Sequence, residues 1–205
     1  MKELTRRQKR RQETIEEILT IAREEMREHG VAGLRLSMIA KRLGIRTPSL
    51  YTYFESKDAI YDELFRRGFL EFGQLMAEGP SREGSVREKL LSSLETYMRF
   101  AQENPELYQL MFQRPVPGFV PSDESMAVSL DNVAKAQADF EEIFRSGELE
   151  TDLPVEEARD LCFALQHGLT ELHLANNPDL PVGEGRFGKL TAQSVQLLLD
   201  AWRKS

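Results

Sequence analysis

Apolar residues recur along most of the chain every three or four positions, which is the spacing of one face of an α-helix. Alternation of apolar and polar residues, the mark of a half-buried strand, nowhere persists long enough to predict one. The sequence therefore predicts an all-α fold of about nine helices. Their expected ranges are 12–28, 36–43, 48–54, 57–76, 86–101, 105–112, 123–146, 154–176 and 185–203.

Turn and cap residues support several of these boundaries. Gly44 interrupts the second segment, and Thr47 followed by Pro48 predicts an N-cap with proline at the first helical position, where a missing N–H costs nothing. Ser85 and Glu88 stand three apart before an apolar run, which is the capping-box pattern. These signals place helix starts near residues 48 and 86.

Charge is distributed unevenly along the 205 residues. The 27 basic and 34 acidic side chains give a net charge of −7, which taken alone argues against a general polyanion binder. Residues 1–80, however, contain 15 basic and 13 acidic residues, a net of +2, whereas residues 81–205 contain 12 and 21, a net of −9. The asymmetry indicates two parts with different partners.

Several classes of protein are disfavoured. A single cysteine, Cys162, excludes an internal disulfide and a cysteine-based zinc site. No apolar run approaches the roughly 18 residues of a membrane span, and no apolar core follows the basic N-terminus, so we expect a cytoplasmic protein without membrane association. His29, His167 and His173 stand in no metal-binding or catalytic motif. We therefore expect no metal, no cofactor and no enzymatic activity.

The segment from Leu36 to Phe54 has the spacing of a helix-turn-helix unit. A helix of about eight residues precedes a tight turn at Gly44, and a short second helix carries small polar side chains at its front. In such units the second helix enters the major groove of DNA and its front residues meet base edges. Leu50 and Phe54, four positions apart, would face inward. Helix pairs joined at a glycine also occur in many all-α proteins, so this spacing alone leaves DNA binding open.

Basic residues gather around this unit and at the N-terminus. Residues 35–57 contain five basic residues and one acidic residue, a local charge of +4 that suits phosphate binding. Residues 1–11 contain six basic residues against Glu3, a local charge of +5. This N-terminal segment reads either as a disordered tail or as an arm that adds affinity for phosphates or enters the minor groove.

The run from Ile39 to Ile60, IAKRLGIRTPSLYTYFESKDAI, strongly resembles the DNA-binding signature of the TetR family of bacterial transcriptional regulators. The glycine, the Leu-Tyr pair, the phenylalanine and the Ser-Lys pair are in register, and the resemblance extends over about residues 10–60. It implies an all-helical homodimer whose N-terminal helix-turn-helix binds operator DNA. It also implies a larger C-terminal domain that binds a small molecule and dimerises.

The resemblance assigns DNA contacts position by position. Lys57 lies where the family commonly contacts phosphate, at a helix N-terminus that also attracts an anion. Arg35 stands where the family usually has a Ser or Thr cap, so either Ser37 caps one turn late or Arg35 contacts phosphate. The full set of expected DNA-binding residues is Arg35, Arg46, Thr47, Pro48, Ser49, Tyr51, Thr52, Tyr53 and Lys57.

The C-terminal half resembles a TetR subgroup called WHG, after a Trp, a His and a Gly. Here Phe163 stands at the Trp position, whereas His167 and Gly168 are kept. Aromatic and methionine side chains on successive helices indicate either an ordinary core or a pocket for a partly apolar small molecule. The expected effector contacts are Tyr97, Tyr108, Met111, Phe112, Phe163 and His167.

The last two predicted helices carry leucines at helical spacing. In the family such a pair meets its copy as a four-helix bundle, which a twofold protein needs to read a palindrome. The alternative is that these side chains only close the core of one chain. The expected interface residues are Leu165, Leu169, Leu172, Leu198 and Trp202.

Taken together, the sequence predicts a DNA-binding domain at 1–56 with an arm at 1–11, a connecting helix at 57–80, and a ligand-binding and dimerisation domain at 81–205 that opens with a linker at 81–84. The expected function is a ligand-responsive repressor that binds a palindromic operator as a homodimer and leaves it when the effector binds. The alternatives are a transcriptional activator, or a helical ligand-binding or protein-interaction module without specific DNA binding.

Overall fold

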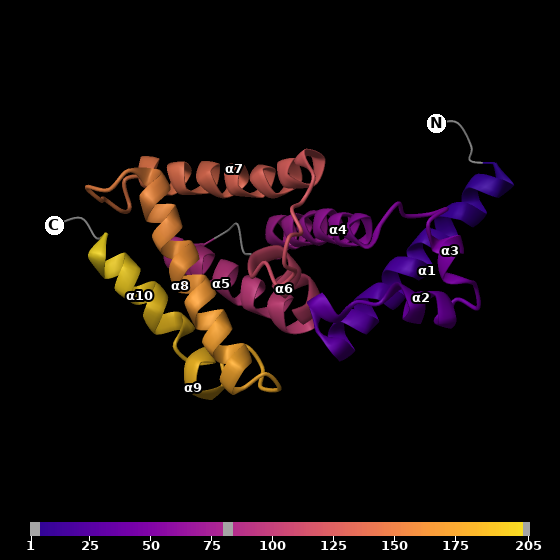
Figure 1. The fold of residues 1–205 in the computed structure, drawn as a ribbon. Helices are drawn as coiled ribbons and strands as arrows, with labels where there is room; N and C mark the ends of the chain where they lie inside the picture. The colour runs from indigo at the N-terminus through magenta and orange to yellow at the C-terminus, as the bar shows by residue number, and fades with distance from the viewer. Residues whose placement is uncertain (1–4, 80–83, 203–205) are drawn as a thin grey trace. The chain divides into compact units, whose positions relative to one another are not determined.

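The computed structural model describes residues 5–79 and 84–202, and within these ranges it contains α-helices and one 3-10 turn but no β-strand. The all-α class is therefore confirmed. The helices (Figure 1) are α1 (Arg6–His29), α2 (Leu36–Arg42), α3 (Thr47–Leu50), α4 (Lys57–Glu78), α5 (Val86–Glu103), α6 (Pro105–Phe112), α7 (Asp123–Arg145), α8 (Val155–Asn176), α9 (Gly185–Gly188) and α10 (Thr191–Ala201), with the 3-10 turn η1 (Val31–Gly33) between α1 and α2.

The chain forms two compact units. The N-terminal unit comprises Met1–Gly68 and Pro105–Met126, and the C-terminal unit comprises Phe69–Asn104 and Ala127–Ser205. This division departs from the expected boundaries, since α6 and the loop after it group with the N-terminal helices. The N-terminal unit holds α6 through the buried carboxylate of Glu106, which pairs with Arg23 and Arg27 of α1. The functional boundaries at 56 and 81 remain a prediction.

Helix α1 begins six residues earlier than its apolar spacing indicates. Thr5 is its N-cap, and Thr5 and Gln8 form a capping box in which the Thr5 hydroxyl accepts a hydrogen bond from the Gln8 backbone N–H. Residues 6–11 of the expected arm are therefore helical, so a disordered tail is wrong for this part. The rest of the arm, residues 1–4, lies outside the described residues, as does most of the expected linker.

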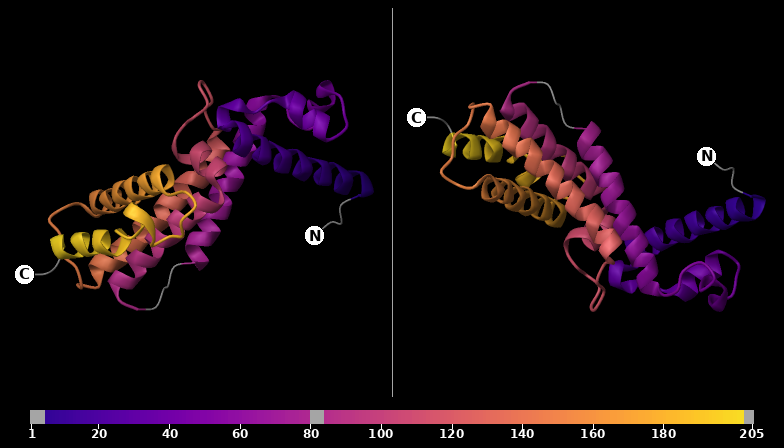
Figure 2. Two further views of the ribbon diagram at one scale, coloured as in Figure 1. Left: turned by 90° about the horizontal axis from the view of Figure 1, so that it is seen from below. Right: turned by 90° about the horizontal axis from the view of Figure 1, so that it is seen from above.

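The C-terminal unit is built on α5, α8 and α10, which pack against one another, and α8 and α10 lie side by side in both views of Figure 2. Its core includes Leu94, Met98, Leu169, Val195 and Trp202. The capping box at the start of α5 is confirmed: the Ser85 hydroxyl accepts from the backbone N–H of residue 88, and the Glu88 carboxylate accepts from that of residue 85.

The single helix expected at 185–203 is wrong, because a turn at Lys189 and Leu190 separates α9 from α10. Gly188, the last residue of α9, packs against the buried His173 of α8, where an added Cβ would lie 2.9 Å from the imidazole Nδ1. Apolar spacing alone could not reveal this close approach. None of the helices in the described part of the chain is long and apolar enough to span a bilayer.

Candidate nucleic-acid interface

Helices α2 and α3 form the expected helix-turn-helix. The turn between them places Gly44 at a φ of +68°, in the left-handed region that favours glycine. The backbone N–H of Ile45 reaches back 3.0 Å to the carbonyl oxygen of Ala40 and closes the turn. Leu50 of α3 is buried together with Ile39 and Ala40 of α2, so the two helices are fixed to each other by a common apolar contact face.

The start of α3 differs in detail from the expected one. Arg46, rather than Thr47, is the N-cap, and no side chain caps this end, while Thr47 and Pro48 occupy the first two helical positions. Proline is tolerated there because the first N–H groups of a helix have no intrahelical partner. The regular helix also ends at Leu50 instead of Phe54, and residues 51–53 continue as a turn. Pro48 has no N–H, and the Ser49 N–H donates to the carbonyl oxygen of Arg46 at 2.8 Å, so the first turn of α3 is closed by its own backbone.

The expected DNA contacts lie on this unit and are largely accessible. Tyr51 is 54% exposed, and Thr47, Tyr53 and Lys57 are half-buried. Arg35 is the N-cap of α2, and its side chain makes no capping hydrogen bond. It therefore does not replace the Ser or Thr that usually caps this helix in the family. The remaining exposed members of the set are Arg35, Arg46, Pro48, Ser49 and Thr52.

Two cations stack on tyrosine rings beside this surface. The guanidinium of Arg11, near the start of α1, lies 5.9 Å from the ring centre of Tyr53, and the ammonium of Lys57 lies 5.5 Å from that of Tyr61. Such cation–π contacts are attractive and leave the cation partly accessible. Arg11 therefore belongs beside α3, a placement that the basic N-terminal segment alone could not predict.

The positive charge around the unit is smaller than the count of basic residues indicates. Arg42 forms an ion pair with Glu24 of α1 and lies 3.7 Å from the carboxylate of Glu25. Part of its charge is thus already neutralised within the N-terminal unit. Lys41 and Arg46 are exposed, and these carry more of the surface charge than Arg42.

Helix α4 begins directly behind the helix-turn-helix. The Ser56 hydroxyl accepts a hydrogen bond from the Ala59 N–H at 3.0 Å and caps its start. Tyr61 is buried and donates its hydroxyl proton to the carbonyl oxygen of Val31 at 2.7 Å. Burial, with a smaller contribution from the charge of Asp58, raises the pKa of Tyr61 to about 12. This neutral hydrogen bond ties α4 to the turn η1 that precedes α2.

Ion pairs hold α1 to its neighbours in the N-terminal unit. Arg67 of α4 pairs with Glu63 and with Glu16 of α1, and hydrogen bonding to Arg67 lowers the pKa of Glu16. Glu106 of α6 accepts from Arg23 at 2.9 Å and from Arg27 at 2.8 Å. Arg27 and Glu106 lie 79 positions apart in sequence, so the spacing of residues along the chain could not predict their ion pair.

The expected effector residues divide between the units. Tyr108, Met111 and Phe112 belong to the N-terminal unit, where the rings of Tyr108 and Phe112 lie 5.4 Å apart. Tyr97, Phe163 and His167 belong to the C-terminal unit. An open pocket of about 410 Å³ between α1 and α4 includes none of the six; its lining residues are Gln12, Ile15, Phe54, Ala59, Asp62, Glu63, Arg66 and Arg67.

A polar contact lies among aromatic rings in the C-terminal unit. The Tyr97 hydroxyl is 2.6 Å from His167 Nδ1, the two rings meet edge to face, and Phe72 packs 5.7 Å from the Tyr97 ring centre. Burial lowers the pKa of His167, against a weaker opposing effect of Glu171. Cys162 packs against the core, and burial raises its pKa to about 12, so its thiol stays protonated.

The expected interface residues do not share one environment. Leu169 and Trp202 are buried in the core of the C-terminal unit, and Leu165 and Leu198 pack against it. These positions fit the alternative reading, in which they close the core of one chain. Leu172 is exposed, as are three further leucines on or beside the same two helices, Leu161, Leu190 and Leu197. Helices α8 and α10 thus keep an exposed apolar surface, to which only Leu172 of the five expected residues contributes an exposed side chain.

Comparison with known families agrees with this architecture. The family model described as bacterial regulatory proteins, tetR family, matches residues 18–64, and that described as tetracyclin repressor-like, C-terminal domain, matches residues 90–199, over half of the chain. The chain belongs to the TetR family. It is accordingly a helix-turn-helix transcriptional regulator, and the expected family resemblance is confirmed in both halves.

Three known proteins are similar to this chain over most of its length. The uncharacterized HTH-type transcriptional regulator YdgC of Bacillus subtilis (strain 168) is 27% identical over 192 residues, 91% of each chain. A solved protein with unknown function from Rhodococcus sp. RHA1 has a TM-score of 0.75 at 17% identity, covering 93% of this chain and 95% of its own. The regulator FadR from Bacillus subtilis, solved in complex with stearoyl-CoA, has a TM-score of 0.69 at 20% identity, and the match covers 91% of this chain and 98% of FadR.

Proposed function

We propose that this TetR-family regulator is a homodimeric repressor that binds a palindromic operator and is released by a small-molecule effector. The observation that carries the proposal is the α2–α3 unit, which leaves hydrogen-bonding side chains exposed on a short helix beside a cationic surface. A regulator of chromosomal genes acts in the cytoplasm of a bacterial cell.

The exposed side chains suit two kinds of DNA contact. Ser49 and Thr52 are small hydroxyl residues at the exposed front of the unit, and with Thr47 they are suited to hydrogen bonding with base edges. Tyr51, Lys57 and Arg46 are suited to the phosphate backbone, where contacts fix register without reading sequence. We assign base reading to the threonines and phosphate binding to the larger residues.

The effector contacts are proposed from the aromatic group of the C-terminal unit. Tyr97 and His167 form a polar pair that Phe72 flanks, and a few placed polar groups among apolar ones are typical of small-molecule sites. FadR, which shares the fold, was solved with stearoyl-CoA. A ligand with a long apolar part is therefore the effector class that we would test first.

The dimer is proposed to form through the exposed apolar surface of α8 and α10. Its leucines, Leu161, Leu172 and Leu197, are large apolar side chains that a second copy would remove from water. A twofold dimer sets two recognition helices about one DNA turn or a multiple apart. We propose that effector binding shifts α4, whose residues belong to both units, and thereby changes that separation.

Genome-wide mapping of bound DNA tests the first part of the proposal. We expect enrichment of a palindromic site, and fluorescence anisotropy with that site should show affinity well above that for scrambled DNA. Enrichment without any common site would contradict operator binding. Stearoyl-CoA is the first effector probe, and it should lower operator affinity; if it and shorter acyl-CoA molecules leave affinity unchanged, this effector class is excluded. A reporter gene then distinguishes repression from activation.

A further inference from the structure

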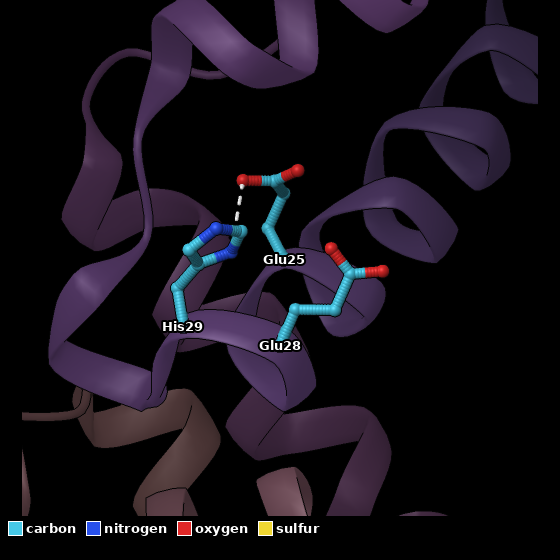
Figure 3. A group of neighbouring side chains, drawn as sticks. All are labelled: Glu25, Glu28 and His29. Atoms are coloured by element: carbon cyan, nitrogen blue, oxygen red, sulfur yellow. Dashed lines mark ion pairs between the residues drawn. The ribbon is translucent and has the colours of Figure 1, made fainter.

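The last turn of α1 presents three side chains with metal-binding donor atoms. Glu25, Glu28 and His29 occupy positions i, i+3 and i+4, which lie next to one another on a helix surface. Their ligand atoms all lie within 4.8 Å of one another, and Figure 3 shows Glu25 and His29 turned toward each other with Glu28 beside them on the same helix. In the part of the chain that the structure describes, this is the one group of three such residues at that spacing.

The two oxygens of Glu25 have different surroundings. Glu25 is only 2% exposed, although it carries a carboxylate. Its Oε1 lies 3.7 Å from Arg42 Nη1, which compensates that side of the group. Its Oε2 is buried, lies 3.6 Å from His29 Nδ1 and accepts no hydrogen bond from the described residues. A buried carboxylate oxygen without a donor is costly, and a cation beside it would remove that cost.

The donor set indicates the class of ion. Calcium and magnesium prefer sites made of oxygen ligands alone, whereas imidazole nitrogen with carboxylate oxygen suits zinc and similar divalent transition metals. We propose that Glu25, Glu28 and His29 bind a divalent transition-metal ion such as Zn²⁺, with Glu25 Oε2 and His29 Nδ1 as its innermost protein ligands. Glu28 and His29 are exposed, so the ion reaches the site from solvent. The site is independent of the proposed operator and effector functions.

Isothermal titration of the full-length, untagged, chelator-treated protein with ZnCl₂ tests this proposal. We expect one ion per chain in the wild type, and His29→Gln should weaken binding by about tenfold or more, because substitutions at and around metal ligands have effects of this order. Glu28→Gln should weaken it in the same direction. Glu17→Gln is the matched control, since Glu17 is an exposed carboxylate about three turns before Glu28 on the same helix, and it should leave binding unchanged.

Two results would overturn the site. One is the absence of saturable zinc binding to the wild-type protein, and the other is equal zinc affinity in the wild type and in His29→Gln. The second result would place any bound zinc elsewhere, because His167 and His173 are intact in that variant. Glu25→Gln is informative where circular dichroism shows that it folds, but the test rests on exposed His29, whose replacement leaves the core of the N-terminal unit in place.

Discussion

Tyr51 offers the sharpest test of the proposed DNA contacts. Its side chain is 54% exposed, so truncation removes little packing and should leave the thermal unfolding midpoint nearly unchanged. Loss of a hydrogen bond to a charged phosphate costs about 1.5–3 kcal/mol, so Tyr51→Ala should weaken operator binding by roughly 10- to 100-fold. Fluorescence anisotropy measures the affinity, and Tyr51→Phe, which removes only the hydroxyl, should account for most of the loss. Wild-type affinity in both variants would remove Tyr51 from the interface.

The pKa of His167 should be lower than that of a solvated histidine. Because its folded pKa is lowered while the unfolded one stays near about 6.5, the unfolded chain binds more protons between these two values. The contribution of His167 to stability is therefore complete above the unfolded pKa and is lost as the pH falls through that value toward the folded one. NMR titration of the imidazole C–H signal should give a midpoint below about 6.5. A midpoint at or above about 6.5 would show that burial does not outweigh the opposing effect of Glu171 on the pKa of His167.

The sequence predicted the helix-turn-helix better than the side-chain contacts around it. Periodicity, Gly44 and the position of Pro48 were enough to find the helix-turn-helix, because each is a local signal. The neutralisation of Arg42 by Glu24 and the stacking of Arg11 on Tyr53 depend on side chains brought together by folding. The spacing of Glu25, Glu28 and His29 is also local, but the sequence does not show that Glu25 is buried with one carboxylate oxygen that accepts no hydrogen bond from the described residues.

A buried carboxylate links α1 and α6. Glu106 has no exposed side-chain surface, whereas the side chains of Arg23 and Arg27 are 30% and 50% exposed. Removing both arginines would leave a buried charge uncompensated, at a cost of about 3 kcal/mol or more. Glu106→Gln instead leaves two arginines that water can solvate, so it should destabilise by less, about 1–2 kcal/mol.

Urea unfolding can compare the free energies of unfolding of two variants, the Arg23→Ala/Arg27→Ala double variant and Glu106→Gln. The double variant should have the lower free energy of unfolding, and its loss should diminish when Glu106→Gln is added, because the unpaired charge is then gone. Additive losses in the triple variant would contradict direct coupling between Glu106 and the arginines.

Helix packing over long sequence separations was beyond the reach of pattern analysis. The sequence showed the apolar face of each long helix, but it did not show which other helix that face packs against. Leu169 and Trp202 were expected between two chains and instead lie in the core of the C-terminal unit, since burial within one chain and burial between two produce the same leucine spacing. The close approach of Gly188 to His173, just before the break at the start of α10, is likewise a contact that only the fold brings about.

Assembly of two chains can be tested with a matched pair of surface leucines. Leu197 on α10 is 72% exposed and Leu130 on α7 is 60% exposed, and both belong to the C-terminal unit. A charge at Leu197 would have to be desolvated within the proposed interface, whereas one at Leu130 would stay in water. Light scattering should therefore give the mass of one chain for Leu197→Glu and of two chains for Leu130→Glu.

The same pair connects assembly with DNA recognition. A palindrome is read by two recognition units held at a fixed spacing, and a single chain offers only one. Leu197→Glu should thus lose most of its operator affinity while its helix content stays unchanged, although residue 197 belongs to the other unit from the DNA-binding surface. Leu130→Glu should bind as the wild type does. If Leu197→Glu were monomeric and still bound the operator with wild-type affinity, recognition would not depend on the dimer, and the proposed release by a change of helix separation would fail with it.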